Sequence, residues 1–358
     1  MPSSLNYIGY GSRVPGMRNI KEIETAAGQR IMAGFEGTEL NGDLRFLIDT
    51  IRIGGLILFS RNITGRDQLE NLCKGASEYA LMRGLPELLI AIDQEGGTVA
   101  RLKAPDFTEF PGAPFIETEA DAAMFARVTA RELREMGINM NMAPVMDVAP
   151  ENVDSIMSRR IFSRDPRTVS KIGTIIINGL QRRGIMPVAK HFPGIGRTTL
   201  DSHFHLPDLE TDLEDLEAFD LLPFKAAIEN DVAGIMLSHV RYISIDPEWP
   251  ASLSPEIAVN LLRNKMRYNG VVFTDDLEMK AISNHYEIPA IAGQVLEAQV
   301  DIALACKSGS VIEKTFESMC RLMKDSRQLA EKAEFSIPRI ANLKSRLSKV
   351  DDLAKNQD

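Results

Sequence analysis

Short apolar runs recur along the whole chain, and each ends in polar or glycine-rich residues that lead into a helix-like segment. Runs without polar alternation are typical of strands buried on both faces, as in a parallel sheet covered by helices. We count eight such runs, which are IMAGF from Ile31, GLILF from Gly55, LLIAID from Leu88, INMNM from Ile138, IMPVAK from Ile185, AGIMLS from Ala233, GVVFT from Gly270 and VDIALA from Val300.

Amphipathic segments between the runs predict helices, for example over residues 121–136, 167–183 and 213–230. Gly137 and Gly184 follow the first two segments, where a glycine commonly ends a helix. Eight repeats of strand and helix indicate an α/β fold, a single-domain (β/α)₈ barrel of the TIM type. A doubly wound sheet with a small second domain is the alternative.

No Pro/Gly/Ser-rich linker or charge run divides the chain into parts. We therefore expect one barrel domain over residues 1–358. It has a short N-terminal extension at about 1–28 and a charged outer helical segment at about 325–358.

The composition narrows the classes of partner and compartment. The 358 residues are 44% hydrophobic, which is enough for a large core, and the net charge of −9 argues against binding to nucleic-acid phosphates. No stretch approaches the roughly 18 apolar residues that span a bilayer, and the first residues lack a secretory pattern. The three cysteines fit neither a disulfide framework nor a zinc site. We expect a cytoplasmic protein that contacts neither membrane nor nucleic acid.

Polar clusters follow four of the predicted strands. They are DQEGGTVAR from Asp93, KHFPGIGRTTLDSHFH from Lys190, SHVR from Ser238 and DDLEM from Asp275. The interior of a (β/α)₈ barrel is filled by side chains, so its chemistry is carried by residues at the carboxyl ends of the strands. The clusters therefore lie on one predicted rim, and a functional site is expected there.

Several residues of this rim also have a purely structural explanation. Asp276 can cap the following helix, and backbone amides can hold Glu95 in a turn. His239 can be a hydrogen-bonded histidine below the rim. His205 and His285 have no strong sequence context, so a solvated or structural role is expected for both.

Three chemistries fit the rim to different degrees. A metal site needs several ligands at close spacing, but a glycine-rich loop separates His191 from His203. A phosphate-cradling loop needs Lys and Ser/Thr after its glycines, which GIG lacks. Glycosyl transfer needs an ionised carboxylate at the anomeric carbon and a second group that protonates the leaving oxygen. Asp275 can be the carboxylate and His203 the proton carrier, with Asp201 placed to orient the imidazole.

The motifs DQEGGTVAR, KHFPGIG, DSH and GVVFTDDLEM resemble those of the family 3 glycoside hydrolases. The resemblance is strongest to the single-domain bacterial β-N-acetylglucosaminidases (β-hexosaminidases) of peptidoglycan recycling, and it extends from about Ile31 to about Cys306. It implies a (β/α)₈ barrel and a glycosidase that needs no metal or organic cofactor.

The resemblance also implies roles for individual positions. Asp275 matches the catalytic nucleophile, His203 the acid/base histidine, and Asp201 the aspartate paired with that histidine. Five further side chains match residues that hold the non-reducing sugar, namely Asp93, Arg101, Arg160, Lys190 and His191.

Two positions depart from the family pattern. Ile195 stands where the family usually has the second histidine of KHFPGHG, and Thr98 stands where it usually has the arginine of GGRV. Ile195 lies on a loop that is mobile in such enzymes, so we expect an effect on loop closure and affinity more than on chemistry. Neither change removes a predicted catalytic group.

These features predict a retaining exo-β-N-acetylglucosaminidase, a monomer or weak homo-oligomer. Its predicted substrate is a small carbohydrate or muropeptide, such as GlcNAc linked to anhydro-muramic acid. A β-glucosidase, a β-xylosidase or a glycoside phosphorylase with the same nucleophile is the nearest alternative. A sugar-binding protein without catalysis is the alternative from another class.

Overall fold

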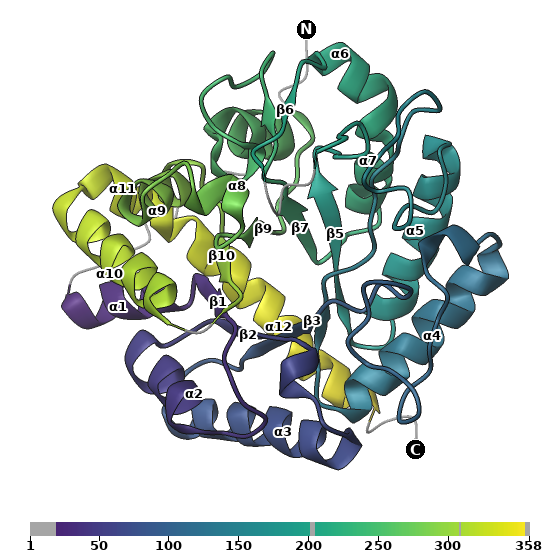
Figure 1. Ribbon diagram of the computed structural model, residues 1–358. Helices are drawn as coiled ribbons and strands as arrows, with labels where there is room; N and C mark the ends of the chain where they lie inside the picture. Colours follow the sequence, from purple (N-terminus) through teal and green to yellow (C-terminus); the bar gives the residue numbers. More distant parts are fainter. Residues whose placement is uncertain (1–18, 201–204, 308, 355–358) are drawn as a thin grey trace, which may run out of the picture.

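The computed structural model describes residues 19–200, 205–307 and 309–354. Eight parallel strands form a closed barrel, and helices surround it (Figure 1). The order around the barrel is β1, β10, β9, β7, β5, β4, β3 and β2, so each barrel strand pairs with the next along the chain and the last pairs with the first. The prediction of a single-domain (β/α)₈ barrel is confirmed.

Each of the eight apolar runs coincides with one barrel strand, and β5 and β9 each extend two residues beyond their run. The barrel strands are β1 (Ile31–Ala33), β2 (Gly55–Leu58), β3 (Leu89–Ile92), β4 (Met140–Asn141), β5 (Met186–Phe192), β7 (Gly234–Leu237), β9 (Val271–Asp276) and β10 (Ile302–Ala305). A separate parallel pair is formed by β6 (Asp208–Leu209) and β8 (Arg241–Tyr242).

Helices follow the strands in sequence and cover them from outside. The α-helices are α1 (Ile20–Gly28), α2 (Gly42–Phe46), α3 (Arg66–Met82), α4 (Glu119–Glu135), α5 (Pro166–Gln181), α6 (Leu213–Asp215), α7 (Leu222–Glu229), α8 (Lys280–Ser283), α9 (Ile288–Glu297), α10 (Ser310–Asp325), α11 (Arg327–Glu334) and α12 (Ser336–Ala354). The 3₁₀ turns are η2 (Ser60–Asn62), η3 (Ala113–Phe115) and η5 (Ala251–Leu253), and the π-helical segments are η1 (Leu47–Ile51), η4 (Leu216–Asp220) and η6 (Glu256–Lys265). Within the described ranges, no helix combines the length and apolarity needed to cross a bilayer.

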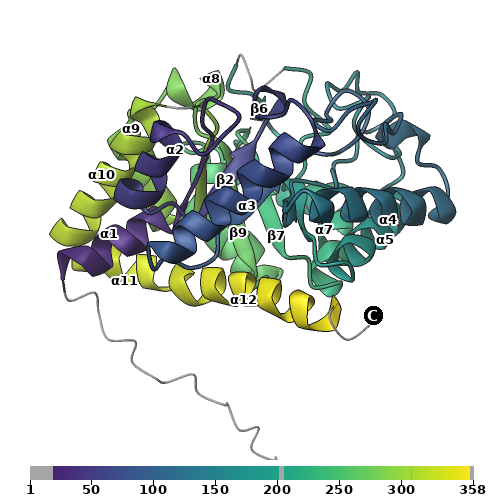
Figure 2. The same ribbon diagram turned by 90° about the horizontal axis from the view of Figure 1, so that it is seen from below.

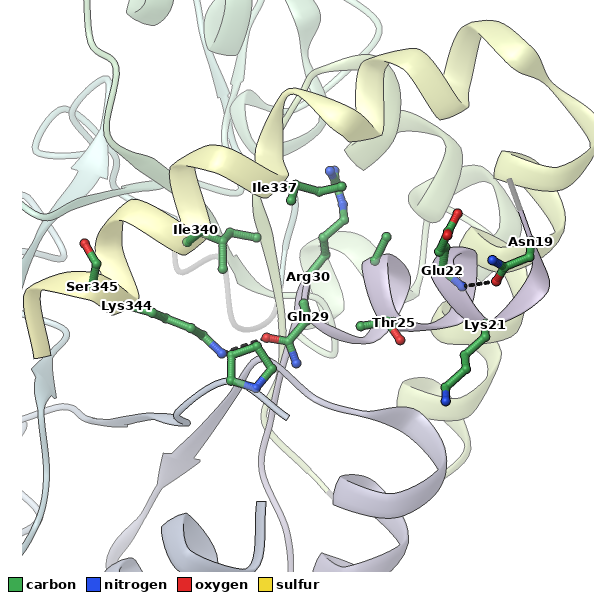
Figure 3. Close-up of a pocket in the computed structure, with 13 residues that line it drawn as sticks. Asn19, Lys21, Glu22, Thr25, Gln29, Arg30, Ile337, Ile340, Lys344 and Ser345 are labelled. Atoms are coloured by element: carbon green, nitrogen blue, oxygen red, sulfur yellow. Dashed lines mark hydrogen bonds between the residues drawn. The ribbon is translucent and has the colours of Figure 1, made fainter. Parts of the chain in front are cut away.

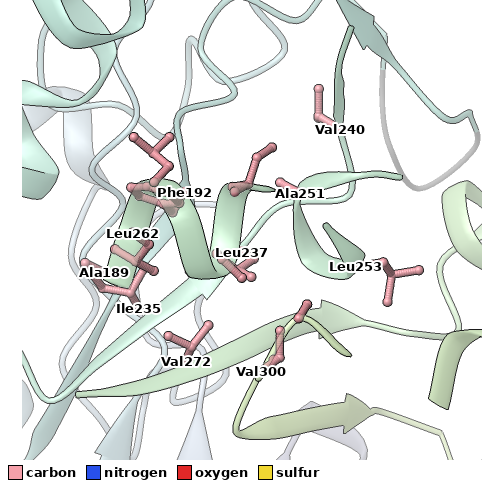
Figure 4. Packing of buried hydrophobic residues seen from close by; sticks show 14 of the residues in the cluster. Ala189, Phe192, Ile235, Leu237, Val240, Ala251, Leu253, Leu262, Val272 and Val300 are labelled. Carbon is pink, nitrogen blue, oxygen red and sulfur yellow. The ribbon is translucent and has the colours of Figure 1, made fainter. Parts of the chain in front are cut away.

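Successive residues of one strand face two different hydrophobic layers. In β7, Met236 belongs to the cluster inside the barrel, whereas Ile235 and Leu237 belong to the layer between strands and helices (Figure 4). In β9, Phe273 faces the inside and Val272 the outer layer. Because both layers are apolar, the strands show no polar alternation in the sequence.

The C-terminal helix α12 lies across the amino-terminal end of the barrel (Figure 2). Its Ile340, Leu343 and Leu347 belong to the same hydrophobic cluster as the residues inside the barrel. The spacing of these three residues places them on one helix face. The segment at about 325–358, expected as an outer helix, therefore includes a helix that closes one end of the barrel. This leaves the carboxyl end of the strands as the open end.

Candidate active site

Charged side chains from β5 and from the segments that follow β3 and β4 form an ion cluster at the carboxyl end of the barrel. Lys190 is 2% exposed, and its Nζ lies 2.7 Å from both Asp93 Oδ1 and Glu95 Oε1. Arg101 Nη2 lies 3.2 Å from Asp93 Oδ2. Arg160 donates twice to Glu95, from Nε at 2.9 Å and from Nη2 at 2.7 Å. The structure thus joins four of the five predicted sugar-binding residues through Asp93 and Glu95.

The turn expected at Glu95 is present, because the N–H of Glu95 donates to the Val99 carbonyl at 2.9 Å. The Glu95 carboxylate, however, is held by Lys190 and Arg160 at the centre of this cluster and not by backbone amides. Burial raises the pKa of Glu95, but Lys190 and Arg160 outweigh burial and lower that pKa to about 2. Burial lowers the pKa of Lys190, yet Asp93 and Glu95 raise it above its ordinary value. The charges of Glu95 and Lys190 are therefore fixed at neutral pH.

An aromatic ring supports the outer edge of the cluster. The guanidinium carbon of Arg101 lies 5.2 Å from the centre of the Phe59 ring, and that of Arg61 lies 4.6 Å from the same centre. Both distances permit cation–π attraction. Phe59 directly follows β2, so the end of that strand also helps to orient Arg101 towards Asp93.

His191, the fifth predicted sugar-binding residue, is held by a carboxylate that the sequence analysis missed. The Nδ1 atom of His191 lies 2.8 Å from Asp147 Oδ2, and the N–H of Ile195 donates to Asp147 Oδ1 at 2.8 Å. A carboxylate only accepts here, so Nδ1 carries the proton and Nε2 is left as an acceptor. That Nε2 faces Arg160 Nη2 at 3.5 Å. Asp147 lies just beyond the fourth apolar run, and this position near the carboxyl end of a predicted strand could have marked it as a site residue.

Asp275 is the next-to-last residue of β9, and its Oδ1 accepts a hydrogen bond from the N–H of Asp276 at 2.8 Å. Burial raises the pKa of Asp275. His239 and His191 in their charged forms, the Asp276 N–H and Lys190 outweigh burial and lower this pKa below its ordinary value. Asp275 is therefore ionised at neutral pH, as a carboxylate nucleophile must be.

His239 positions the backbone beside Asp275. Its Nε2 lies 2.8 Å from the Asp276 carbonyl oxygen, and its Nδ1 lies 2.7 Å from Ser252 Oγ. Because a carbonyl only accepts, Nε2 donates and Nδ1 accepts from the serine hydroxyl. Burial lowers the pKa of His239, which keeps the ring neutral at pH 7. This is the buried, hydrogen-bonded role that the sequence allowed for His239.

The neighbouring Asp276 has a structural function. Its Oδ1 accepts from the N–H groups of Glu278 and Cys306, each at 3.1 Å. These bonds fix the turn after β9 and connect it to the end of β10. The carboxylate of Asp275 thus accepts fewer hydrogen bonds from backbone N–H groups than the carboxylate of Asp276.

The loop after β5 packs closely on the barrel. A Cβ atom at Gly196 would lie 1.9 Å from the carbonyl oxygen of Val148, so only glycine permits this approach. Ile195 is 5% exposed, and its side chain belongs to the hydrophobic layer outside the strands. An apolar residue at position 195 is therefore accommodated by packing, while its N–H holds Asp147.

A buried ion pair lies under the same loop. Asp220 Oδ2 accepts from Arg197 Nε at 2.8 Å, and a Cβ at Gly194 would approach Asp220 Cβ to 3.0 Å. Burial raises the pKa of Asp220 to about 6 even though Arg197 opposes the change. The loop is thus anchored on both sides of Ile195. The predicted acid/base pair, Asp201 and His203, lies outside the described residues.

Across residues 19–200, 205–307 and 309–354, no group of three or more His, Cys, Asp or Glu side chains is arranged to hold an ion. His191 and His239 each have both ring nitrogens directed at protein groups. The arrangement instead provides a buried ionised carboxylate beside a cluster of polar donors and acceptors.

A family model described as the glycosyl hydrolase family 3 N terminal domain matches residues 20–350. The β-hexosaminidase of Methylococcus capsulatus is 37% identical over 291 residues, which cover 79% of this chain and 84% of that protein. The β-hexosaminidase A of Pseudoalteromonas piscicida is 34% identical over 87% of this chain, which spans 56% of that longer protein.

Solved structures of related proteins share the fold. The family 3 β-N-acetylglucosaminidase of Paenibacillus sp. FPU-7 superimposes with a TM-score of 0.85 at 35% identity, covering 92% of this chain and 63% of that one. The β-N-acetylhexosaminidase of Beutenbergia cavernae superimposes with a TM-score of 0.84 at 28% identity, covering 90% of this chain and 98% of that one.

Proposed function

Because this chain belongs to glycosyl hydrolase family 3, we propose that it is an exo-β-N-acetylglucosaminidase that removes non-reducing terminal GlcNAc from peptidoglycan fragments. The proposal starts from the chain being a glycoside hydrolase of the β-N-acetylhexosaminidase type. The proposed setting is cytoplasmic, and free Cys73, Cys306 and Cys320 are compatible with a reducing compartment.

The observation that carries the proposal is the ionised Asp275 at the carboxyl end of β9, next to the cluster around Lys190. In the first step, Asp275 attacks the anomeric carbon while the bond to the leaving oxygen breaks and His203 gives that oxygen a proton. In the second step, His203 takes a proton from water, which displaces Asp275 from the anomeric carbon. Two displacements at one carbon retain the configuration.

The ion cluster supports the binding of a sugar ring. Asp93 and Glu95 supply two negative charges, while Lys190, Arg101 and Arg160 supply three positive ones. A GlcNAc ring carries hydroxyl groups that can donate to the carboxylates and accept from the cations. Since each charged group already has a partner, the cluster is preorganised and loses little side-chain entropy when a sugar binds.

The test is the hydrolysis of an aryl β-GlcNAc by wild type, Asp275→Asn and Asp276→Asn. We expect Asp275→Asn to lose about 10³-fold or more in kcat, because an amide is a far weaker nucleophile. Asp276→Asn is the matched control, since its amide oxygen can still accept from the N–H groups of Glu278 and Cys306. Full activity of Asp275→Asn would overturn the proposal.

The same assay distinguishes the related enzymes. Aryl β-glucoside and aryl β-xyloside are compared with aryl β-GlcNAc, first in phosphate and then in a buffer without phosphate. We expect a preference for the 2-acetamido sugar and free GlcNAc as the product in both buffers. Release of GlcNAc 1-phosphate would identify a phosphorylase, and binding of GlcNAc without turnover would identify a sugar-binding protein.

A further inference from the structure

Helices α1 and α12 border a cavity at the amino-terminal end of the barrel, on the opposite side from the candidate active site (Figure 3). Its volume is about 760 Å³, and small-molecule sites commonly measure about 300–1,000 Å³. We call it the α1–α12 cavity. Its apolar lining is made by Ala26, Pro86, Ile337, Ile340 and Ala341.

A buried lysine lines this apolar cavity, beside the buried Arg30, whose guanidinium donates to the carbonyl oxygens of Ala333 and Val300. Lys344 is 6% exposed, and its Nζ donates to Gln29 Oε1 at 2.8 Å. The amide of Gln29 is oriented by its own Nε2, which donates to the carbonyl oxygens of Arg52 at 2.9 Å and Ile53 at 3.3 Å. Gln29 therefore offers its oxygen to the lysine, and Figure 3 shows the two side chains meeting at the cavity wall.

The Lys344 ammonium has more hydrogen-bonding capacity than its surroundings use. An ammonium group has three donors, and within the described part of the chain only Gln29 accepts from it. No carboxylate among those residues forms an ion pair with Lys344. Glu87 acts on Lys344 electrostatically but forms no close ion pair with it. Burying a cation without a close counter-ion is costly, and the cost falls when an anion binds beside it.

We propose that the α1–α12 cavity binds a small amphipathic carboxylate, whose carboxylate group pairs with Lys344 while its apolar body lies against Ile337 and Ile340. The remaining charged lining fits such a ligand, because Lys21 and Arg30 add two positive charges and Glu22 only one negative charge. The chain's own residues 1–18 contain Arg13 and Arg18 but no Asp or Glu, so they offer no side-chain counter-ion for Lys344.

The protonation of Lys344 supports the proposal. Burial lowers the pKa of Lys344 to about 7, and Glu87 opposes the change. The other charged groups that line the cavity are Lys21, Glu22 and Arg30. A bound carboxylate favours the charged lysine, so the ligand must bind more tightly at pH 6 than at pH 8.5.

The test is calorimetric titration of the full chain with decanoate, decanol and decylamine, which share one apolar chain and differ in charge. We expect decanoate to bind about tenfold more tightly than decanol, the size of one charge-assisted hydrogen bond, and decylamine to bind weakest. From pH 6 to pH 8.5 the affinity for decanoate should fall about fivefold or more. Equal affinities for the three ligands, or no binding, would overturn the proposal.

Two variants locate the ligand. Lys344→Met keeps the apolar stem and should weaken decanoate about tenfold, without changing decanol and without a remaining pH dependence. Ala341→Trp fills the exposed side of the cavity and should abolish binding of both. Lys74→Met, an exposed lysine on α3, is the matched control for loss of one charge and should bind like wild type.

Circular dichroism verifies that each variant is folded, and hydrolysis of aryl β-GlcNAc should be unchanged in all three because the cavity is at the other end of the barrel. Unchanged decanoate affinity in folded Lys344→Met would refute the assignment of the carboxylate to this lysine. Self-association of the chain that Ala341→Trp abolishes would instead make a second copy the occupant, and would also refute it.

Discussion

Replacing Glu95 by glutamine tests the ion cluster at the carboxyl end of the barrel. The amide keeps the shape of the side chain but removes the negative charge that Lys190 and Arg160 share. A pKa lowered from 4.5 to about 2 corresponds to roughly 3 kcal/mol of stabilisation by the ionised form at pH 7. We therefore expect the free energy of unfolding of Glu95→Gln to be about 3 kcal/mol lower than that of wild type at pH 7.

The pH dependence of this difference has a defined sign. An acid whose pKa is lowered by folding stabilises the protein above its unfolded pKa, and the effect is lost as the pH falls through the folded pKa. For Glu95 that window lies between about 4.5 and about 2. The gap in stability between wild type and Glu95→Gln should therefore narrow as the pH is lowered from 5 towards 2.

Urea unfolding followed by circular dichroism at several pH values measures the gap. Glu70→Gln is the matched control, because Glu70 is exposed on α3, and its effect should stay within about 0.5 kcal/mol. We also expect KM for aryl β-GlcNAc to rise in Glu95→Gln, since Lys190 and Arg160 lose a shared partner. Equal stability of wild type and Glu95→Gln at pH 7, or a difference that stays constant with pH, would show that the Glu95 charge does not stabilise the fold.

Three further predictions concern the catalytic groups and their supports. His203→Ala should slow aryl substrates with poor leaving groups far more than those with good ones, and equal losses would reject the acid role. Asp147→Asn should raise KM about tenfold or more by releasing His191, whereas an unchanged KM would contradict that role. Gly196→Ala should cost about 1–3 kcal/mol of unfolding free energy, because its Cβ would meet the Val148 carbonyl; an unaltered urea midpoint would exclude this clash.

The barrel could be predicted because its strands face apolar layers on both sides. Met236 and Phe273 point inside while Ile235 and Val272 point outside, so the runs are continuous in the sequence and end where the polar rim begins. The same logic placed Asp93, Lys190 and Asp275 at one end of the barrel, where the structure has them. Because all the barrel strands are parallel, residues at their carboxyl ends lie at the same end of the barrel.

Other features depend on contacts between distant segments. Glu95 next to two glycines looks like part of a turn, and only the fold brings Arg160 and Lys190 to it. Asp147 is a single acid in an apolar stretch, and its partner His191 is 44 residues away. The charged, amphipathic pattern of α12 is compatible with any surface helix, and its position across the barrel follows from packing alone.

The role of Asp275 as nucleophile is tested most directly by identifying the residue that bonds to the sugar. Wild type is incubated with a fluorinated GlcNAc derivative that has an activated leaving group, and the digested protein is examined by mass spectrometry. We expect one sugar attached to Asp275, and we expect free GlcNAc to protect Asp275 from labelling. A label on Asp276, Asp93 or Glu95, or no label together with an inverted product in NMR, would contradict that role.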